Sequence, residues 1–172
     1  MKILNKLGDY GPILLFFYSL FLLWEYKNMF FYYNIGIFFS IILNLIFKGI
    51  IQEPRPMFDN KKINLVKMYG KNYLYQNGIP FDIFGMPSGH AQTAFFSTIF
   101  VYLTLKNINI LIFYILFSIL ICYQRVKYEY HSIQQVIVGS IVGVFFGHLM
   151  FDFSKNKIKG NLREKPDDNG PT

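Results

Sequence analysis

Three short clusters of polar residues interrupt a largely apolar sequence, and each adjoins a long run without charge. They are Lys48 with Arg55-Pro56, Pro87-Ser88-Gly89-His90, and Arg125 with His131. Together they hold three basic side chains and two of the three histidines in the chain. These residue types fit a phosphoryl group, because its oxygens need several charge-assisted donors and its transfer depends chiefly on positioning and electrostatic stabilisation.

Two histidines complete this chemistry without a metal or cofactor. One attacks phosphorus as a neutral imidazole, and the other, protonated, gives its proton to the leaving oxygen. Gly89 and the helix start after Pro87 would offer N–H groups and a positive dipole end to the same anion. The sequence has no acidic pair at ligand spacing and no Cys/His set, so the lysine and arginines must supply the positive charge.

The composition indicates a membrane protein. Of 172 residues, 53% are hydrophobic, 20% aromatic and only 16% charged, which is too apolar for an ordinary soluble domain and excludes disordered, collagenous and disulfide-scaffold classes. Cys122 is the single cysteine and cannot form an internal disulfide. The 17 basic residues exceed the 10 acidic ones, but they are spread between apolar runs, which favours anionic lipid or phosphate over nucleic acid.

The runs between charged residues predict five membrane-spanning helices, because an unpaired charge at the bilayer centre costs at least ~2.5 kcal/mol. The predicted spans are residues 10–24, 28–47, 83–105 with the helix proper from about Ser88, 107–124 and 132–151. The sequence therefore predicts an all-α, polytopic membrane helix bundle with its active site at one membrane face. We expect one integral membrane domain over residues 1–153, a long functional loop over 52–86, and an unstructured polar tail over 154–172.

The order of the spans places the three polar clusters on the same side of the membrane. The first cluster closes the second span, the second opens the third span, and the third joins the fourth and fifth spans. Basic residues in the loops are equally numerous on both sides, so the positive-inside rule does not assign a face to the cytoplasm.

The clusters resemble the three signature motifs of the type 2 phosphatidic acid phosphatase superfamily, which also includes vanadium haloperoxidases and glucose-6-phosphatase. The resemblance covers residues 48–139. It implies that three cations hold the phosphate, that two residues at the helix start donate to it, that one histidine protonates the leaving group and that the other forms a phosphohistidine. In that order the residues are Lys48, Arg55 and Arg125; Ser88 and Gly89; His90; and His131.

Two positions depart from the superfamily pattern. Its third motif usually has Ser before the Arg and Asp four residues after the His, where this chain has Gln124 and Gln135. Gln135 lies on the same helix face as His131 and can orient its ring, but it cannot stabilise an imidazolium as a carboxylate would. The departure therefore suggests either lower activity or a second carboxylate, Glu129, that stabilises the imidazolium in its place.

Gln135 is also familiar at this place in the dolichyl diphosphatase branch. The chain resembles that branch in the stretches Ile51–Pro56, Phe84–Ser88 and Tyr130-His131 as well. That resemblance implies removal of a phosphate from dolichyl diphosphate at the endoplasmic reticulum membrane. A phosphatidate or general phospholipid phosphatase shares every catalytic residue and stays open, as does a non-catalytic lipid-headgroup binder or scaffold. A haloperoxidase fits such a membranous chain less well.

Four further polar residues have alternative interpretations. Glu53 is a candidate partner for Lys48 or Arg55, with an ordinary surface pair as the default. Asp82 and Glu129 are near the motifs and are candidates for tuning a histidine, although solvated loop charges are the simpler interpretation. His148 lies toward the far end of the fifth span, and we interpret it as structural or interfacial.

Overall fold

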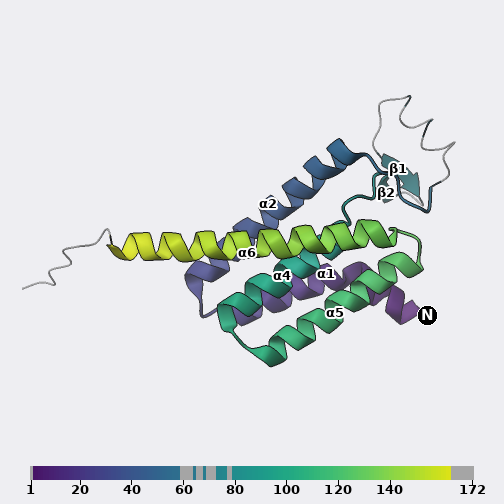
Figure 1. Ribbon diagram of the computed structural model, residues 1–172. Coiled ribbons are helices and arrows are strands. Elements are labelled where there is room, and N and C mark those ends of the chain that lie inside the picture. The colour runs from purple at the N-terminus through teal and green to yellow at the C-terminus, as the bar shows by residue number, and fades with distance from the viewer. Residues whose placement is uncertain (1, 59–63, 65–67, 69–72, 77–78, 164–172) are drawn as a thin grey trace, which may run out of the picture.

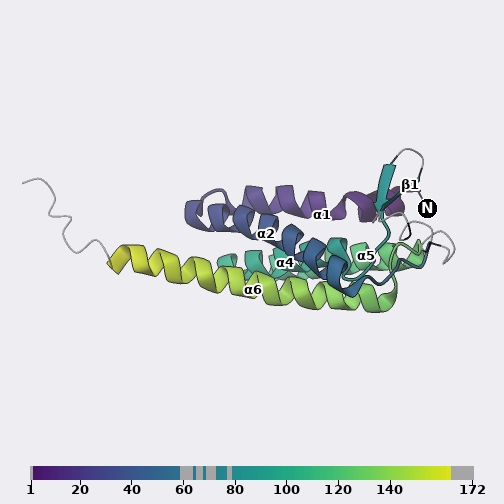
Figure 2. The same cartoon turned by 90° about the horizontal axis from the view of Figure 1, so that it is seen from above.

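Long helices pack into an elongated bundle, some of them crossing obliquely, in the computed structural model, which describes residues 2–58, 64, 68, 73–76 and 79–163 (Figure 1, Figure 2). Over these residues the long helices are α1 (Lys2–Leu23), α2 (Lys27–Ile51), α4 (Gly89–Leu105), α5 (Ile108–Lys127) and α6 (Ile133–Arg163). A short antiparallel hairpin of β1 (Tyr73–Gln76) and β2 (Ile79–Asp82) lies at one end of the bundle. The sequence predicted the loop but not this hairpin.

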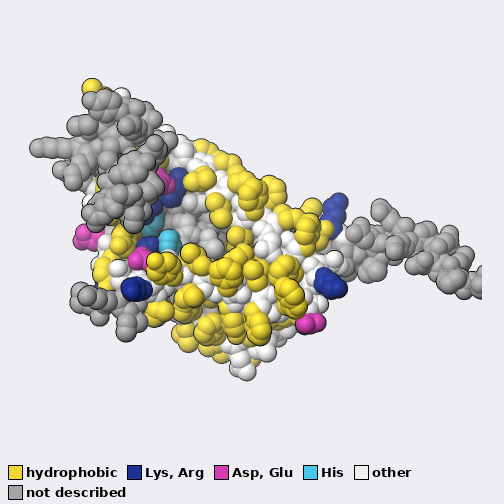
Figure 3. Space-filling view, turned by 180° about the vertical axis from the view of Figure 1, so that it is seen from behind, with side chains coloured by type: hydrophobic (Ala, Val, Ile, Leu, Met, Phe, Trp, Pro, Cys, Tyr) yellow, Lys and Arg dark blue, Asp and Glu magenta, His cyan; other side chains and the backbone are white. Residues whose placement is uncertain are grey.

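The prediction of an all-α membrane bundle is confirmed. Within the described ranges, four helices are long and apolar enough to cross a membrane, namely α1, α2, α5 and α6. The first predicted span was the shortest, yet its helix begins well before the apolar run, at Lys2. Hydrophobic side chains are spread over the face of the bundle in Figure 3. Large ones are exposed, among them Phe21 (76%) and Phe145 (67%), as expected for a surface that contacts lipid.

Helix α4 occupies the centre of the bundle and packs against all four of its neighbours. It carries more polar residues than a lipid-facing span tolerates, and they bond to other helices instead. Asn44 donates to Gln92 Oε1 (2.9 Å), Ser97 bonds the Tyr33 hydroxyl (2.8 Å), and Thr98 bonds Ser118 (3.0 Å). Such bonds, each worth about 1 kcal/mol in a membrane, hold the helix that begins with Gly89-His90 in place.

Helix α6 approaches α4 closely because small residues recur every four positions along it. A Cβ at Gly143 would overlap the backbone carbonyl of Gln92, and one at Gly147 would lie 2.9 Å from the carbonyl oxygen of Phe96. This is the small-residue spacing that lets membrane helices pack backbone to backbone. The contact positions the start of α6, and hence the residues just before it, against the start of α4.

Gly143→Ala should therefore destabilise the bundle by about 1 to 3 kcal/mol, because the methyl group forces the two backbones apart. Gly49→Ala is the matched control, since a Cβ there has no atom within 4 Å and alanine favours helix. The midpoint of thermal unfolding in detergent measures both. Equal midpoints for the two variants would contradict the close packing of α4 and α6.

The C-terminal tail differs from its prediction. Helix α6 continues through Ser154 to Arg163, where we expected an unstructured segment, and residues 164–172 lie outside the described part of the chain. The charge-free run measured the apolar length of the span rather than the length of the helix. Lysine is a good helix former, and basic residues near a helix C-terminus interact favourably with the dipole, so the helix extends past the apolar run.

Candidate active site

Backbone pairing brings the three polar clusters together at one end of the bundle. The segment after α2 runs beside the segment before α4, where Arg55 N donates to Ile83 O (3.0 Å) and Gly85 N donates to Glu53 O (2.7 Å). Ser88 N then donates to Gln135 O at the start of α6 (2.9 Å). The three clusters thus lie on one side, as the order of the spans predicted.

His131 lies in the turn between α5 and α6 and is 2% exposed. Its Nε2 is 3.1 Å from Arg55 Nη1, and its Nδ1 is 3.1 Å from Gln135 Oε1. Because an arginine can only donate, Nε2 accepts, and the ring proton is on Nδ1, which donates to Gln135. Burial, and next the charge of Arg55, hold the pKa of His131 below its usual value. The ring is therefore neutral at neutral pH, with its unprotonated nitrogen at Nε2.

Two buried cations are each paired with a carboxylate from another element. Lys48 Nζ is 2.6 Å from Asp82 Oδ2 at the end of β2, and Arg125 Nη1 is 2.8 Å from Asp9 Oδ1 on α1. The Arg125 guanidinium also lies 4.6 Å from the centre of the Tyr130 ring. A buried cation without a partner is costly, so these carboxylates stabilise both cations and fix their positions.

Asp9 and the role of Asp82 were not predicted as parts of this site. In the sequence, Asp9 is only the charge that precedes the first predicted span. The order of the spans places Asp9 on the same side of the membrane as the polar clusters, and this could have indicated that it belongs to the site. Which cation it pairs with depends on how α1 packs against α5, which the sequence does not show.

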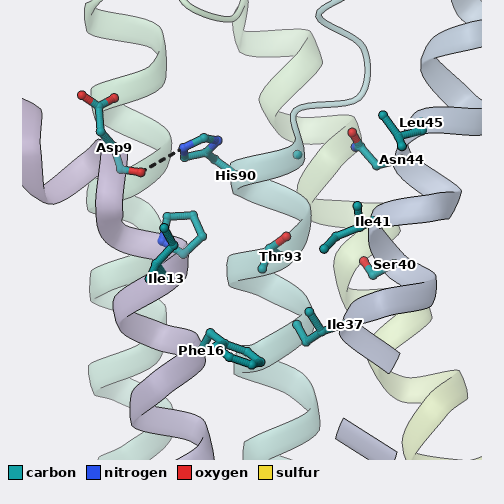
Figure 4. Close-up of a pocket in the computed structure, with 12 residues that line it drawn as sticks. Asp9, Ile13, Phe16, Ile37, Ser40, Ile41, Asn44, Leu45, His90 and Thr93 are labelled. Atoms are coloured by element: carbon teal, nitrogen blue, oxygen red, sulfur yellow. Dashed lines mark hydrogen bonds between the residues drawn. The ribbon is translucent and has the colours of Figure 1, made fainter. Parts of the chain in front are cut away.

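His90 contacts two groups through the same ring nitrogen. Its Nε2 lies 2.8 Å from Arg125 Nη2 and 3.2 Å from the Asp9 backbone oxygen, the contact drawn in Figure 4. Arg125 can only donate, which requires an unprotonated Nε2, whereas the carbonyl can only accept, which requires a protonated one. The two contacts therefore correspond to the two protonation states of Nε2. Such a position suits a group that gains and loses a proton.

Polar atoms at the same place lack partners. Among the described residues, the buried side-chain atoms without a hydrogen bond are the donors Ser88 Oγ and Arg125 Nε and the acceptor Gln124 Oε1, of which only the two donors suit an anion. Gly89 is the first residue of α4, where helix N–H groups have no intrahelical acceptor. Buried polar groups are nearly always satisfied, so these atoms indicate a place for an anion.

A groove of about 540 Å³ leads from this site along the bundle, between α1, α2 and α4. His90 and Asp9 lie at one end of it, and apolar side chains from α1 and α2 face the space below them (Figure 4). The apolar lining includes Ile13, Phe16, Ile37, Ile41 and Leu45. The groove therefore fits an apolar chain attached to a group held beside His90.

The remaining polar residues have partners that differ in part from those expected. Glu53 accepts from Gln135 Nε2 (2.7 Å) rather than pairing with Lys48 or Arg55. Glu129 is exposed in the turn before His131. His148 pairs with Asp152 on α6 (3.0 Å) at the exposed surface, in agreement with a role outside the site.

Residues 29–159 match the model of the PAP2 superfamily. The chain belongs to the PAP2 superfamily. The matched residues include α4, α5 and most of α2 and α6, but not α1. Asp9, which pairs with Arg125, thus comes from a helix outside the matched residues.

This PAP2 chain is 35% identical over 120 residues to the dolichyldiphosphatase of Saccharomyces cerevisiae. The alignment covers 64% of this chain, which spans 45% of the length of that curated relative. No solved structure matches the chain significantly.

Proposed function

We propose that this PAP2 chain is a metal-independent phosphatase that hydrolyses a polyprenyl diphosphate to the monophosphate and phosphate through a phosphohistidine on His131. Dolichyl diphosphate is the favoured substrate. The observation that carries the proposal is the buried His131 ring, whose Nε2 lone pair faces Arg55 at 3.1 Å in a site that also holds Lys48, Arg125 and His90. The neighbouring cations keep this imidazole unprotonated, so that it can act as a nucleophile, and they attract the phosphoryl anion that it attacks.

The reaction takes two steps. His131 Nε2 forms a bond to the terminal phosphorus while the bond to the bridging oxygen breaks, and His90 gives its proton to that oxygen. Water then attacks the phosphohistidine, His90 takes a proton from the water, and the P–N bond breaks to release phosphate. The pairing of His90 Nε2 with either Arg125 or the Asp9 carbonyl supports this change of protonation state.

Three cations and two donors at the start of α4 hold the phosphoryl oxygens in this scheme. Lys48, Arg55 and Arg125 are positively charged. Their attraction to the equatorial oxygens becomes stronger as those oxygens gain negative charge in the transition state. Ser88 Oγ and Gly89 N–H donate to the same group, which supplies the partner that the buried Ser88 hydroxyl lacks. Gln135 accepts from His131 Nδ1–H and so keeps Nε2 unprotonated.

The groove and the relative support a lipid substrate. The groove beside His90 is lined by apolar side chains and runs between helices that contact lipid, which fits a long apolar chain on the phosphate. The relative named dolichyldiphosphatase favours a polyprenyl chain. We place the protein in the endoplasmic reticulum membrane, with residues 1–153 as the membrane domain.

The test is phosphate release by the protein in detergent from dolichyl diphosphate and from phosphatidate, measured side by side with EDTA. We expect fast release from the diphosphate and slow release from phosphatidate. Equal or faster release from phosphatidate would mean that the protein is a general phospholipid phosphatase rather than one for polyprenyl diphosphate. Binding of the diphosphate without release from either lipid would support the headgroup-binding alternative.

A further inference from the structure

We infer that Glu53 is a positioning residue that fixes the Gln135 side-chain amide, and through it the tautomer of the His131 ring. The inference rests on the proposed function, in which His131 Nε2 is the nucleophile. It assigns a function to a carboxylate that does not touch the histidine itself but contacts Gln135, which does.

A continuous chain of hydrogen bonds joins Glu53 to His131. Gln135 Nε2 donates to Glu53 Oε1 (2.7 Å) and to Pro54 O (2.9 Å). On the other side, Gln135 Oε1 accepts from His131 Nδ1 (3.1 Å) and from Ser132 N (3.3 Å). Gln135 itself is 1% exposed, so water does not compete for these bonds.

The donors and acceptors along this chain allow one arrangement. Arg55 at one end can only donate, and the Glu53 carboxylate at the other end can only accept. If the amide turned over, its oxygen would face the Glu53 carboxylate and the Pro54 carbonyl, leaving three acceptors without a donor. Its NH₂ group would then face His131 Nδ1 and favour a proton on Nε2, which would oppose Arg55.

Glu53 does more than orient the amide. A hydrogen bond to a carboxylate is about twice as strong as one between neutral groups, and it polarises the amide so that Oε1 becomes a better acceptor. The negative charge of Glu53 thus strengthens, through the Gln135 amide, the hydrogen bond that holds the His131 ring. This offsets part of what is lost by having glutamine in place of a carboxylate at position 135.

The backbone holds Glu53 where this contact requires it. Gly85 N donates to Glu53 O (2.7 Å), within the paired segments that also place Arg55. A Cβ at Gly85 would overlap the Gln135 amide, so the glycine leaves room for the Gln135 side chain beside the paired segments. Glu53 itself is only half-buried, and a neutral isostere there leaves the packing intact.

Glu53→Gln should lower kcat by about 10- to 100-fold with little change in KM, because it removes the charge and lets the amide turn over. The matched control is Glu129→Gln, which removes an exposed carboxylate two residues before His131. Turnover of polyprenyl diphosphate in detergent measures both. A kcat for Glu53→Gln equal to that of Glu129→Gln would overturn the inference.

Exchanging the two side chains separates positioning from simple packing. Gln135→Glu alone puts two carboxylates at 2.7 Å spacing and should be poorly active. Combined with Glu53→Gln, a carboxylate accepts directly from His131 Nδ1 and the new amide donates to it. We expect the double variant to be at least about tenfold more active than Gln135→Glu alone. A double variant no better than that single variant would overturn the inference.

The ring tautomer gives a readout independent of turnover. In protein labelled with ¹⁵N-histidine and assigned through His131→Ala, the wild-type His131 signals should show a proton on Nδ1 only. In Glu53→Ala the Nε2–H form should appear. A single unchanged tautomer would overturn the inference even if the protein proved inactive on lipid diphosphates, an outcome that would count against the proposed function alone.

Discussion

His131→Ala should abolish phosphate release, with a fall in kcat on the order of 10⁴-fold or more, as expected when a covalent nucleophile is removed. The side chain is buried, neutral and directed by Gln135, and among the described residues no other histidine presents a ring nitrogen to Arg55. Release of phosphate from the lipid diphosphate in detergent measures the effect.

His148→Ala is the matched control for this prediction. It removes a histidine that is exposed and paired with Asp152, away from the three polar clusters. We expect wild-type activity from it. If the two histidine variants lost activity equally, or if His131→Ala kept full release, the assignment of the nucleophile would be wrong.

Arg55→Ala should lower kcat by about 10²- to 10³-fold, comparable to the loss of one preorganised donor to transition-state charge. Arg55 is placed by its Nε, which donates to Asp82 O (2.7 Å), and by its backbone pairing with Ile83. The guanidinium thereby contacts the lone pair on His131 that reacts. Arg55→Lys should recover only part of the rate, because one ammonium cannot reproduce the planar fork of donors.

The same substitution should change the dependence of activity on pH. The Arg55 charge is the second cause, after burial, that lowers the pKa of His131. Removing it raises that pKa, so His131 becomes protonated and unable to attack at a higher pH than in the wild type. The acidic limb of kcat/KM should move upward in Arg55→Ala and stay in place in Lys127→Ala, which removes an exposed cation near the end of α5. Coincident limbs in the two variants would contradict the contact.

Much of the fold followed from the sequence because charge-free length is a strong signal in a membrane protein. Each predicted span corresponds to a helix, and the order of spans placed Arg55, His90 and His131 on one side before any geometry was known. The start of α4 beside Pro87 was also predicted, since proline and glycine mark a helix boundary.

The partners of the buried charges did not follow from the sequence. Lys48 pairs with Asp82, 34 positions away, and Arg125 with Asp9, 116 positions away, because the approach of separate elements decides which carboxylate reaches which cation. Glu53 was expected near Lys48 or Arg55 by its position in the chain. It reaches Gln135 instead because the paired segment turns its side chain toward the start of α6.

The central claim is that His131 carries the phosphoryl group, and trapping that intermediate tests it most directly. The protein is mixed with polyprenyl diphosphate labelled with ³²P at the terminal phosphate, quenched in alkali, and digested for mass analysis. We predict a label that is stable in base, labile in acid and located on His131, and absent from His131→Ala. Rapid turnover with no label on His131, or with label on another residue, would contradict the account.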